Sequence, residues 1–178
     1  MKLPTVALFL LAPVLGACGW IPLPAQSAPD FYFTNSSVQV TPAQVAYMSE
    51  NQLDAGRLSI PSLPYSTITI DADLEYQGKG AAMRLEIFAA AERPNCPSVN
   101  STLPGYSPAL LCTGPEAGQR VAEVLLNTGT RTPLHLEGAV LAHALRAKTL
   151  YLGIRLLSGN PGNNAVIYVT NIHLHGWV

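Results

Sequence analysis

The stretch Thr67-Ile68-Thr69-Ile70-Asp71-Ala72-Asp73-Leu74-Glu75-Tyr76 decides the fold class of this chain. Apolar side chains occupy the even positions, and Thr, Asp or Glu occupies each odd position. Because successive side chains of a strand point to opposite faces of a sheet, this alternation predicts a β-strand. One face of the strand is expected to lie in a core and the other in water.

The alternation recurs along the chain, separated by turns that contain Gly, Asn and Pro. Further strands are expected at 83–87, 150–156 and 165–175, with weaker ones at 31–34, 38–41, 121–126 and 134–136. The run 165–175 is apolar on both faces, which favours a central position in a sheet. About seven or eight short strands with long connections predict an all-β fold, an antiparallel β-sandwich.

Helix-forming residues are confined to two short segments. Residues 139–148 place their apolar residues on one side, which predicts a short helix that crosses between strands. Residues 41–51 are a second candidate, because Thr41-Pro42 resembles a helix cap followed by a first-turn proline. The sandwich is therefore expected to carry one or two short helices.

The N-terminus is built like a secretory signal. Lys2 precedes the apolar run 6–15, which is too short to span a bilayer, and small residues then lead to Cys18. The sequence Leu15-Gly16-Ala17-Cys18 resembles the lipobox of bacterial lipoproteins. The resemblance implies that residues 1–17 are removed and that Cys18 carries a covalent lipid. The alternative is an ordinary secreted protein that is cleaved near Ala17.

This resemblance also implies a place in the cell. The chain would be attached to a membrane outside the cytoplasm, in the cell envelope. Gly19 follows the cysteine where many bacteria place Asp as an inner-membrane retention signal, so the outer membrane or the cell surface is favoured. Prolines in residues 18–30 predict an extended tether, and residues 31–178 are expected to form the folded domain.

Composition and motifs argue against two classes of function. Only 12% of the residues are charged, the formal net charge is −1, and no basic stripe is present, so nucleic acid is not expected as a partner. No catalytic serine elbow, zinc-protease motif or phosphate-binding glycine loop occurs. We therefore expect a non-enzymatic protein with no cofactor besides the covalent lipid on Cys18.

Cys96 and Cys112 form an even pair if Cys18 is acylated, and in an oxidising compartment they predict a disulfide. The alternative is a pair of free or metal-binding thiols. The cysteines lie in a proline-rich loop, residues 93–118, which is a candidate surface for a protein partner. Its apolar candidate residues are Leu103, Tyr106, Leu110 and Leu111. The same loop could instead cover one end of the sandwich.

Two polar patterns are candidates for metal binding. Asp71, Asp73 and Glu75 share one strand face, where they could contribute to a calcium site or an acid–base pair, or simply face solvent. His173 and His175 also share a face, an arrangement typical of half a zinc or copper site. His135 or His143 would have to complete that site, and the alternative is that both histidines are structural.

The strand spacing and the closing strand Val166-Ile167-Tyr168-Val169-Thr170-Asn171-Ile172-His173-Leu174 resemble the jelly-roll sandwiches of carbohydrate-binding modules. Tyr151 and Trp177 are the candidate residues for stacking on a sugar ring. The leading hypothesis is a lipid-anchored envelope protein that binds a protein partner or supports an assembly. The alternatives are a module that binds envelope or external polysaccharide and a histidine-based metal-binding protein.

Overall fold

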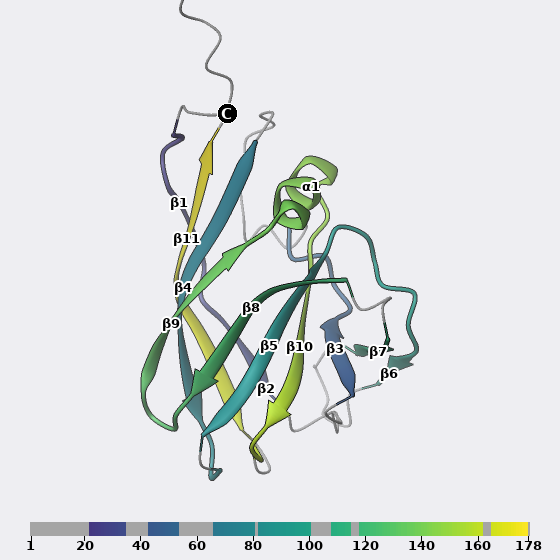
Figure 1. The fold of residues 1–178 in the computed structure, drawn as a ribbon, viewed down its shortest axis with the longest axis vertical. Coiled ribbons are helices and arrows are strands. Elements are labelled where there is room, and N and C mark those ends of the chain that lie inside the picture. The colour runs from purple at the N-terminus through teal and green to yellow at the C-terminus, as the bar shows by residue number, and fades with distance from the viewer. Residues whose placement is uncertain are drawn as a thin grey trace, which may run out of the picture.

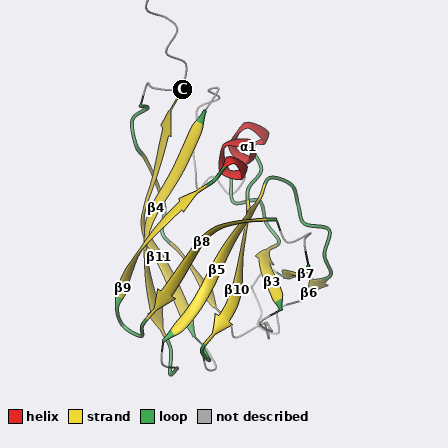
Figure 2. Cartoon of the chain, in the orientation of Figure 1, coloured by secondary structure: helices red, strands yellow, loops and turns green. Residues whose placement is uncertain are grey.

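Two antiparallel sheets pack face to face in the computed structural model, which describes residues 22–34, 43–53, 66–80, 82–100, 108–114, 118–161 and 165–177 (Figures 1 and 2). One helix accompanies the strands in these residues. The predicted all-β sandwich with a short helix is therefore confirmed.

The first sheet has the strand order β1-β11-β4-β9, and β2 pairs with β11 on the same side as β1. Its strands are β1 (Gln26–Ala28), β2 (Phe31–Thr34), β4 (Thr67–Gln77), β9 (Arg131–Glu137) and β11 (Val166–Trp177). Partners flank β11 on both sides, as its apolar sequence predicted.

The second sheet has the strand order β6-β7-β3-β10-β5-β8. Its strands are β3 (Gln44–Met48), β5 (Met83–Ala90), β6 (Ser98–Val99), β7 (Ala109–Thr113), β8 (Gln119–Leu126) and β10 (Tyr151–Ser158). The turn after β8 carries the chain into β9 of the first sheet, where the backbone N–H of Gly129 donates to the carbonyl of Tyr76 (2.8 Å).

The main core lies between the sheets. The even residues of β4 from Ile68 to Tyr76 face it, as the alternation predicted, and meet apolar residues of β5 and β8. Helix α1 (Ala139–Ala147) covers one end of this core with Leu141, Ala142, Ala144 and Leu145 buried (Figure 1). The helix ends at Lys148, whose left-handed backbone lets its N–H reach the carbonyls of Ala144 and Leu145.

The second predicted helix is wrong where the structure describes it. Residues 44–48 form strand β3, which pairs with β10 on one side and β7 on the other. Val45 and Tyr47 alternate into a buried cluster, and β-branched and aromatic residues fit such a half-buried sheet surface well. Pairing with two neighbouring strands therefore outweighs the local cap signal. Thr41, Pro42 and the predicted strand at 38–41 lie outside the described residues.

The predicted boundary between tether and domain also needs correction. Residues 26–28, expected in an extended tether, form β1 and pair with β11. Upstream of β1, the N–H of Leu23 donates to the carbonyl of Gly176 (2.8 Å), and Pro22 forms a bridge with Trp177. In the described part of the chain, the folded domain therefore begins at Pro22 rather than at Phe31.

Candidate functional site

The outer face of the first sheet carries aromatic and polar side chains in rows that cross the strands. One row, which we call the tyrosine row, consists of Tyr32 on β2, Tyr168 on β11, Glu75 on β4 and Arg131 on β9, all in register. Side chains of a strand alternate between faces, so the buried neighbours of Glu75 and Tyr168 in sequence turn these two residues outward.

The two tyrosines are the most exposed aromatic side chains in the described part of the chain. Tyr32 is 54% exposed and Tyr168 is 37% exposed, and their ring centroids lie 6.3 Å apart with an interplanar angle of 49°. Cross-strand aromatic pairs stabilise a sheet modestly, but they need not be exposed to do so. The pair therefore presents two ring faces at a sheet surface that is otherwise polar.

A second row, which we call the histidine row, consists of Ser27, His173, Asp71 and His135 on β1, β11, β4 and β9. The Ser27 hydroxyl lies 3.1 Å from Nδ1 of His173, and His135 Nδ1 lies 2.6 Å from Oδ1 of Asp71. His175 joins the row diagonally, with its Nε2 3.3 Å from Oδ2 of Asp71. One carboxylate therefore holds two imidazoles at the surface.

A β-bulge separates the two rows on β11. Asn171 adopts a left-handed backbone conformation (φ 53°), and the register against β4 shifts between Thr170 and His173. The Asn171 side chain donates to Oδ2 of Asp73 (2.7 Å), and its backbone N–H donates to Oδ1 of Asp30 (3.2 Å). The bulge thereby fixes an amide and a carboxylate between the tyrosines and the histidines.

The electrostatics of the histidine row favour a charged imidazole. The hydrogen bond from His135 to the Asp71 carboxylate is the main cause that raises the pKa of His135 above its ordinary 6.5. The charges of Asp71 and Glu137 act in the same direction, and partial burial opposes them. The row therefore gains positive charge as the pH falls through the raised pKa.

The structure gives each of the three predicted carboxylates a hydrogen-bond partner within the face. Asp71 contacts the two histidines, Asp73 accepts from Asn171, and Glu75 accepts from the side chain of Gln77 (2.8 Å). This arrangement fits a solvated strand face better than it fits a calcium site, in which the carboxylates would be free to bind the ion.

The predicted histidine metal site is only partly assembled. His175 and His135 share Asp71, but His173 contacts Ser27, and His143 lies exposed on α1 in a different part of the fold. Among the described residues, no three His, Cys, Asp or Glu side chains converge in a geometry that could hold a metal ion.

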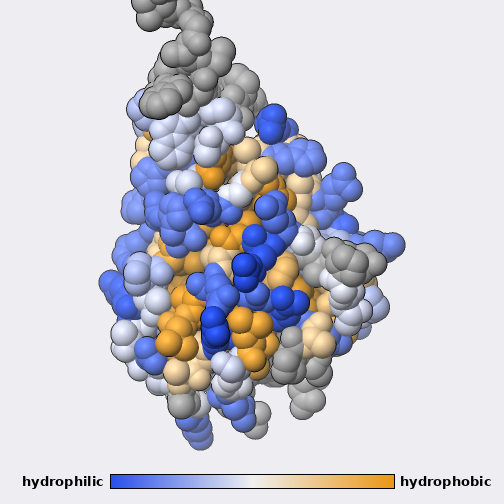
Figure 3. Space-filling view, in the orientation of Figure 1, coloured by the Kyte–Doolittle hydropathy of each residue, from blue (hydrophilic) through white to orange (hydrophobic). Residues whose placement is uncertain are grey.

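The outer face of the second sheet is different because charged side chains bind one another across it. Glu86, whose side chain is 7% exposed, accepts from Arg155 Nε (2.6 Å) and from Arg120 Nη1 (3.0 Å). Arg84 and Arg120 also contact Glu123. Figure 3 shows strongly hydrophilic residues beside hydrophobic ones on this side of the molecule. Leu125 on β8 is 56% exposed.

Glu86 lies on the outer face of this sheet, but it is buried there. Burial alone would raise the pKa of Glu86, but hydrogen bonds and charges from Arg155 and Arg120 outweigh it and hold the pKa below its usual value. The Arg155 guanidinium also lies over the ring of Phe88, 5.0 Å from its centroid. Glu86 therefore stays ionised and holds two arginines on this face.

The cysteine-containing loop contributes strands β6 and β7 to this sheet. Cys96 and Cys112 form the predicted disulfide. Cys112 packs in a second buried cluster, whose other members are Val45, Tyr47, Phe88, Leu110 and Tyr151. Gly153 allows this packing, because a Cβ there would lie 2.8 Å from Cγ1 of Val45 and 2.9 Å from the Tyr47 ring.

The candidate partner-binding residues of the 93–118 loop are therefore not presented as one exposed surface. Leu110 is only 2% exposed and Leu111 is half-buried, while Leu103 and Tyr106 lie outside the described residues. In its described part, the loop adds β6 and β7 to one edge of the second sheet and contributes Leu110 and Cys112 to the second buried cluster.

The two candidate stacking residues do not meet. Tyr151 is buried in the second cluster, and Trp177 lies half-buried at the end of β11 in the other sheet. The exposed aromatic pair is Tyr32 and Tyr168, which the sequence analysis did not single out. The available signal was their position: each tyrosine stands between two apolar residues that are turned toward the core, buried beside Tyr168 and half-buried beside Tyr32, where a polar residue is the rule.

No protein family model matches the chain, and no curated protein matches it significantly. The described residues contain no helix with the length and apolar character needed to cross a membrane.

Proposed function

We propose that this chain is a lipid-anchored, non-enzymatic protein of a bacterial cell envelope that binds carbohydrate through the outer face of its first sheet. The observation that carries the proposal is the exposed Tyr32–Tyr168 pair, in register with Glu75 and flanked by Asp73 and Asn171. Sugar rings present C–H groups to the electron-rich face of an aromatic ring and hydroxyl groups to carboxylates and amides. This face offers both kinds of partner.

Carbohydrate is favoured over a protein partner by the composition of this face. Its central strands present Asp, Glu and His around the tyrosines, whereas the centre of a protein–protein interface is depleted of charged residues. Of the loop residues proposed for a protein partner that the structure describes, Leu110 is buried and Leu111 is half-buried. The first sheet is therefore the better candidate for contact with a ligand.

The proposed cellular location rests on the N-terminal sequence and is supported by the cysteines. A buried disulfide between Cys96 and Cys112 suits a compartment outside the cytoplasm and leaves Cys18 as the third cysteine. Cys18 precedes Pro22 by four residues, a span of at most about 14 Å when extended. Because Pro22 pairs with Trp177, an anchor on Cys18 would hold the domain close to the membrane.

The carbohydrate proposal is tested by retention of the full chain on isolated peptidoglycan and on the polysaccharides of the source envelope. Tyr32→Ala and Tyr168→Ala are each expected to weaken binding about three- to tenfold, since aromatic contacts contribute about 0.5–1.5 kcal/mol. Leu125→Ala is the matched control, because Leu125 is 56% exposed on the other sheet. Equal retention of all three variants on every polysaccharide they bind would contradict the proposal.

The anchor is tested separately by Cys18→Ser. The variant is expected to lose the covalent lipid and to leave the membrane fraction, with glycan binding unchanged. A Cys18→Ser chain that has lost residues 1–17 and still sediments with membranes would show that lipidation is not the tether.

A further inference from the structure

The fold holds the two rings of the exposed tyrosine pair in different ways. Tyr168 lies on β11, which pairs with strands on both sides, and its sequence neighbours Ile167 and Val169 are buried. Tyr32 lies on β2, a strand of four residues that pairs with β11 alone in the described part of the chain. The position of the Tyr32 ring therefore depends on how firmly β2 is attached to the first sheet.

The inner side of β2 is attached to the core through Phe31 and Phe33. Both side chains are half-buried, and their rings pack edge to face with centroids 5.3 Å apart. Side chains of a strand alternate between faces, so the two rings point inward on either side of the outward Tyr32. Backbone pairing with β11 and these two rings therefore hold Tyr32 beside Tyr168.

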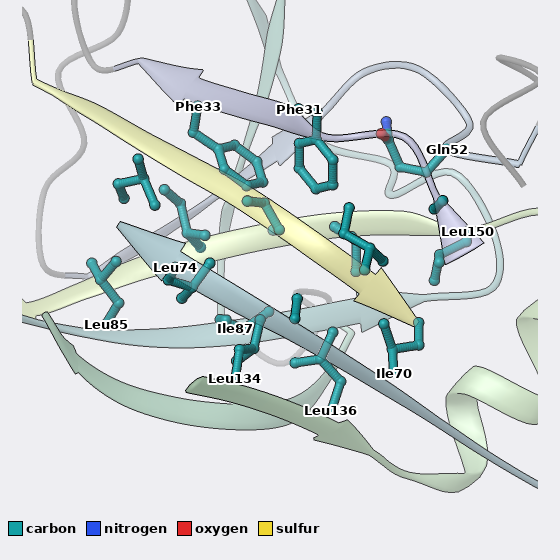
Figure 4. A pocket seen from close by; sticks show the side chains of 18 of the residues that line it. Phe31, Phe33, Gln52, Ile70, Leu74, Leu85, Ile87, Leu134, Leu136 and Leu150 are labelled. Atoms are coloured by element: carbon teal, nitrogen blue, oxygen red, sulfur yellow. The ribbon is translucent and has the colours of Figure 1, made fainter. Parts of the chain in front are cut away.

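Packing beneath these rings is incomplete. An apolar cavity of about 70 Å³ lies between the two sheets, and Phe31 and Phe33 reach into it (Figure 4). Gln52 has the one polar side chain among the described residues that line the cavity, whereas an ordered water needs two to four polar partners. Side chains that border such a void lose dispersion contacts on that side. The two rings therefore stabilise the attached strand less than a close-packed interior would.

We infer that β2 is a movable strand and that Phe31 and Phe33 are positioning residues for the tyrosine pair. Short edge strands with few buried contacts open locally at a lower free energy than the core does. The attached state places the two tyrosine rings together, so a ligand that contacts both rings binds that state. The affinity of such a ligand falls in proportion to the fraction of chains in which β2 is attached. This effect on affinity rests on the proposed carbohydrate site, whereas the movement of β2 does not.

The movement is tested in the full chain without ligand, by hydrogen–deuterium exchange of residues 31–34 and 67–77. Phe33→Ala is expected to raise exchange in residues 31–34 by about tenfold or more, because the strand loses one of its two inner rings. Exchange in residues 67–77 is expected to stay close to that of wild type. Phe33→Leu keeps an apolar side chain and is expected to restore most of the protection.

The matched control is Leu126→Ala. Leu126 is fully buried on β8 and does not line the cavity. Its truncation is expected to lower the melting temperature, because it removes core contacts, without a selective rise of exchange in residues 31–34. The control therefore separates a general loss of stability from the release of β2.

The effect on affinity is tested by retention of the same variants on isolated peptidoglycan. Phe33→Ala is expected to weaken retention at least as much as Tyr32→Ala, although Phe33 points away from the outer face. Leu126→Ala is expected to leave retention unchanged at temperatures where it is folded. Addition of Tyr32→Ala to Phe33→Ala is expected to weaken retention no further, because a released strand no longer contributes Tyr32 to the pair.

The two proposals fail in distinguishable ways. Exchange in residues 31–34 that Phe33→Ala leaves unchanged, or raises equally in all strands, would overturn the inference. Additive losses of retention for Phe33→Ala and Tyr32→Ala would also overturn it. If no envelope polysaccharide retains wild type, the carbohydrate proposal fails, and the exchange result alone decides whether Phe33 holds β2 in place. If thermal melting shows that Phe33→Ala does not fold, Phe31→Ala truncates the other inner ring.

Discussion

The two outer faces of this sandwich use their polar groups in different ways. On the second sheet, Glu86 is buried between Arg155 and Arg120, and the disulfide-containing loop contributes Leu110 and Cys112 to the second buried cluster. On the first sheet, Tyr32 and Tyr168 stand exposed. A face whose groups are buried against one another contributes to stability, whereas a face that keeps its aromatic and polar groups in solvent is available to a ligand.

This comparison predicts that substitutions on the second sheet affect stability and that substitutions on the first sheet affect binding.

The first experiment removes the disulfide with the double substitution Cys96→Ser and Cys112→Ser. The cysteines are 16 residues apart, so the loss is expected to cost about 3 kcal/mol in the chain-entropy model. Urea unfolding measures the cost, and retention on polysaccharide is expected to stay unchanged at temperatures where the variant is folded. A variant that keeps its stability but loses its ligand would place the binding site at the loop instead.

The second experiment removes the central charge of the second sheet with Glu86→Gln. Arg155 and Arg120 lose a charged hydrogen-bond partner, so the expected cost is about 1–3 kcal/mol at neutral pH. The matched control is Glu75→Gln on the first sheet, where the change in stability is expected to stay within about 0.5 kcal/mol. If Glu86→Gln and Glu75→Gln lowered the free energy of unfolding by similar amounts, the two faces would not differ in their contribution to stability.

The pH dependence of the Glu86 contribution gives a further check on the same variant. Because the pKa of Glu86 is lowered in the folded state, its contribution is complete above the unfolded value of about 4.5 and is lost as the pH falls through the lowered pKa. Wild type and Glu86→Gln are therefore expected to converge in stability in acid. A stability difference that stayed constant down to that range would contradict this assignment.

The third experiment titrates His135 by NMR. Its pKa is expected above 6.5 in wild type and closer to 6.5 in Asp71→Asn, because the hydrogen bond to Asp71 is the main cause of the shift. The His135 contribution to stability is present below the unfolded pKa and is lost as the pH rises through the raised folded value. Because His135 is half exposed, its effect on the free energy of unfolding is expected to be small. A pKa of His135 at or below 6.5 in wild type would contradict the hydrogen bond to Asp71.

Much of the fold could be predicted from local pattern. The alternation in residues 67–76 determines the burial of β4 directly, because the period of side-chain direction in a strand is two. The apolar run of β11 predicted its central position, but its outer face, which carries Tyr168, Asn171 and His173, is exposed. The pairing of Cys96 with Cys112 followed from the cysteine count. Residues 44–48 were predicted incorrectly because partner strands from distant sequence, β7 and β10, determine their structure.

The site was harder to predict because it depends on register between strands. Tyr32 and Tyr168 are 136 positions apart in sequence, and only the pairing of β2 with β11 places their rings together. The same holds for His135, Asp71 and His175, which come from three strands. Tyr151 and Trp177 were singled out by residue type alone, and type does not indicate which face of which sheet a residue occupies.

The most direct test of the difference between the two faces is hydroxyl-radical footprinting of the full chain with and without a polysaccharide that retains it. The account predicts that bound polysaccharide protects Tyr32 and Tyr168 and leaves Leu125 and Leu111 as reactive as before. Protection of Leu111 and the rest of the 93–118 loop, with the two tyrosines unchanged, would contradict the assignment of the binding face to the first sheet.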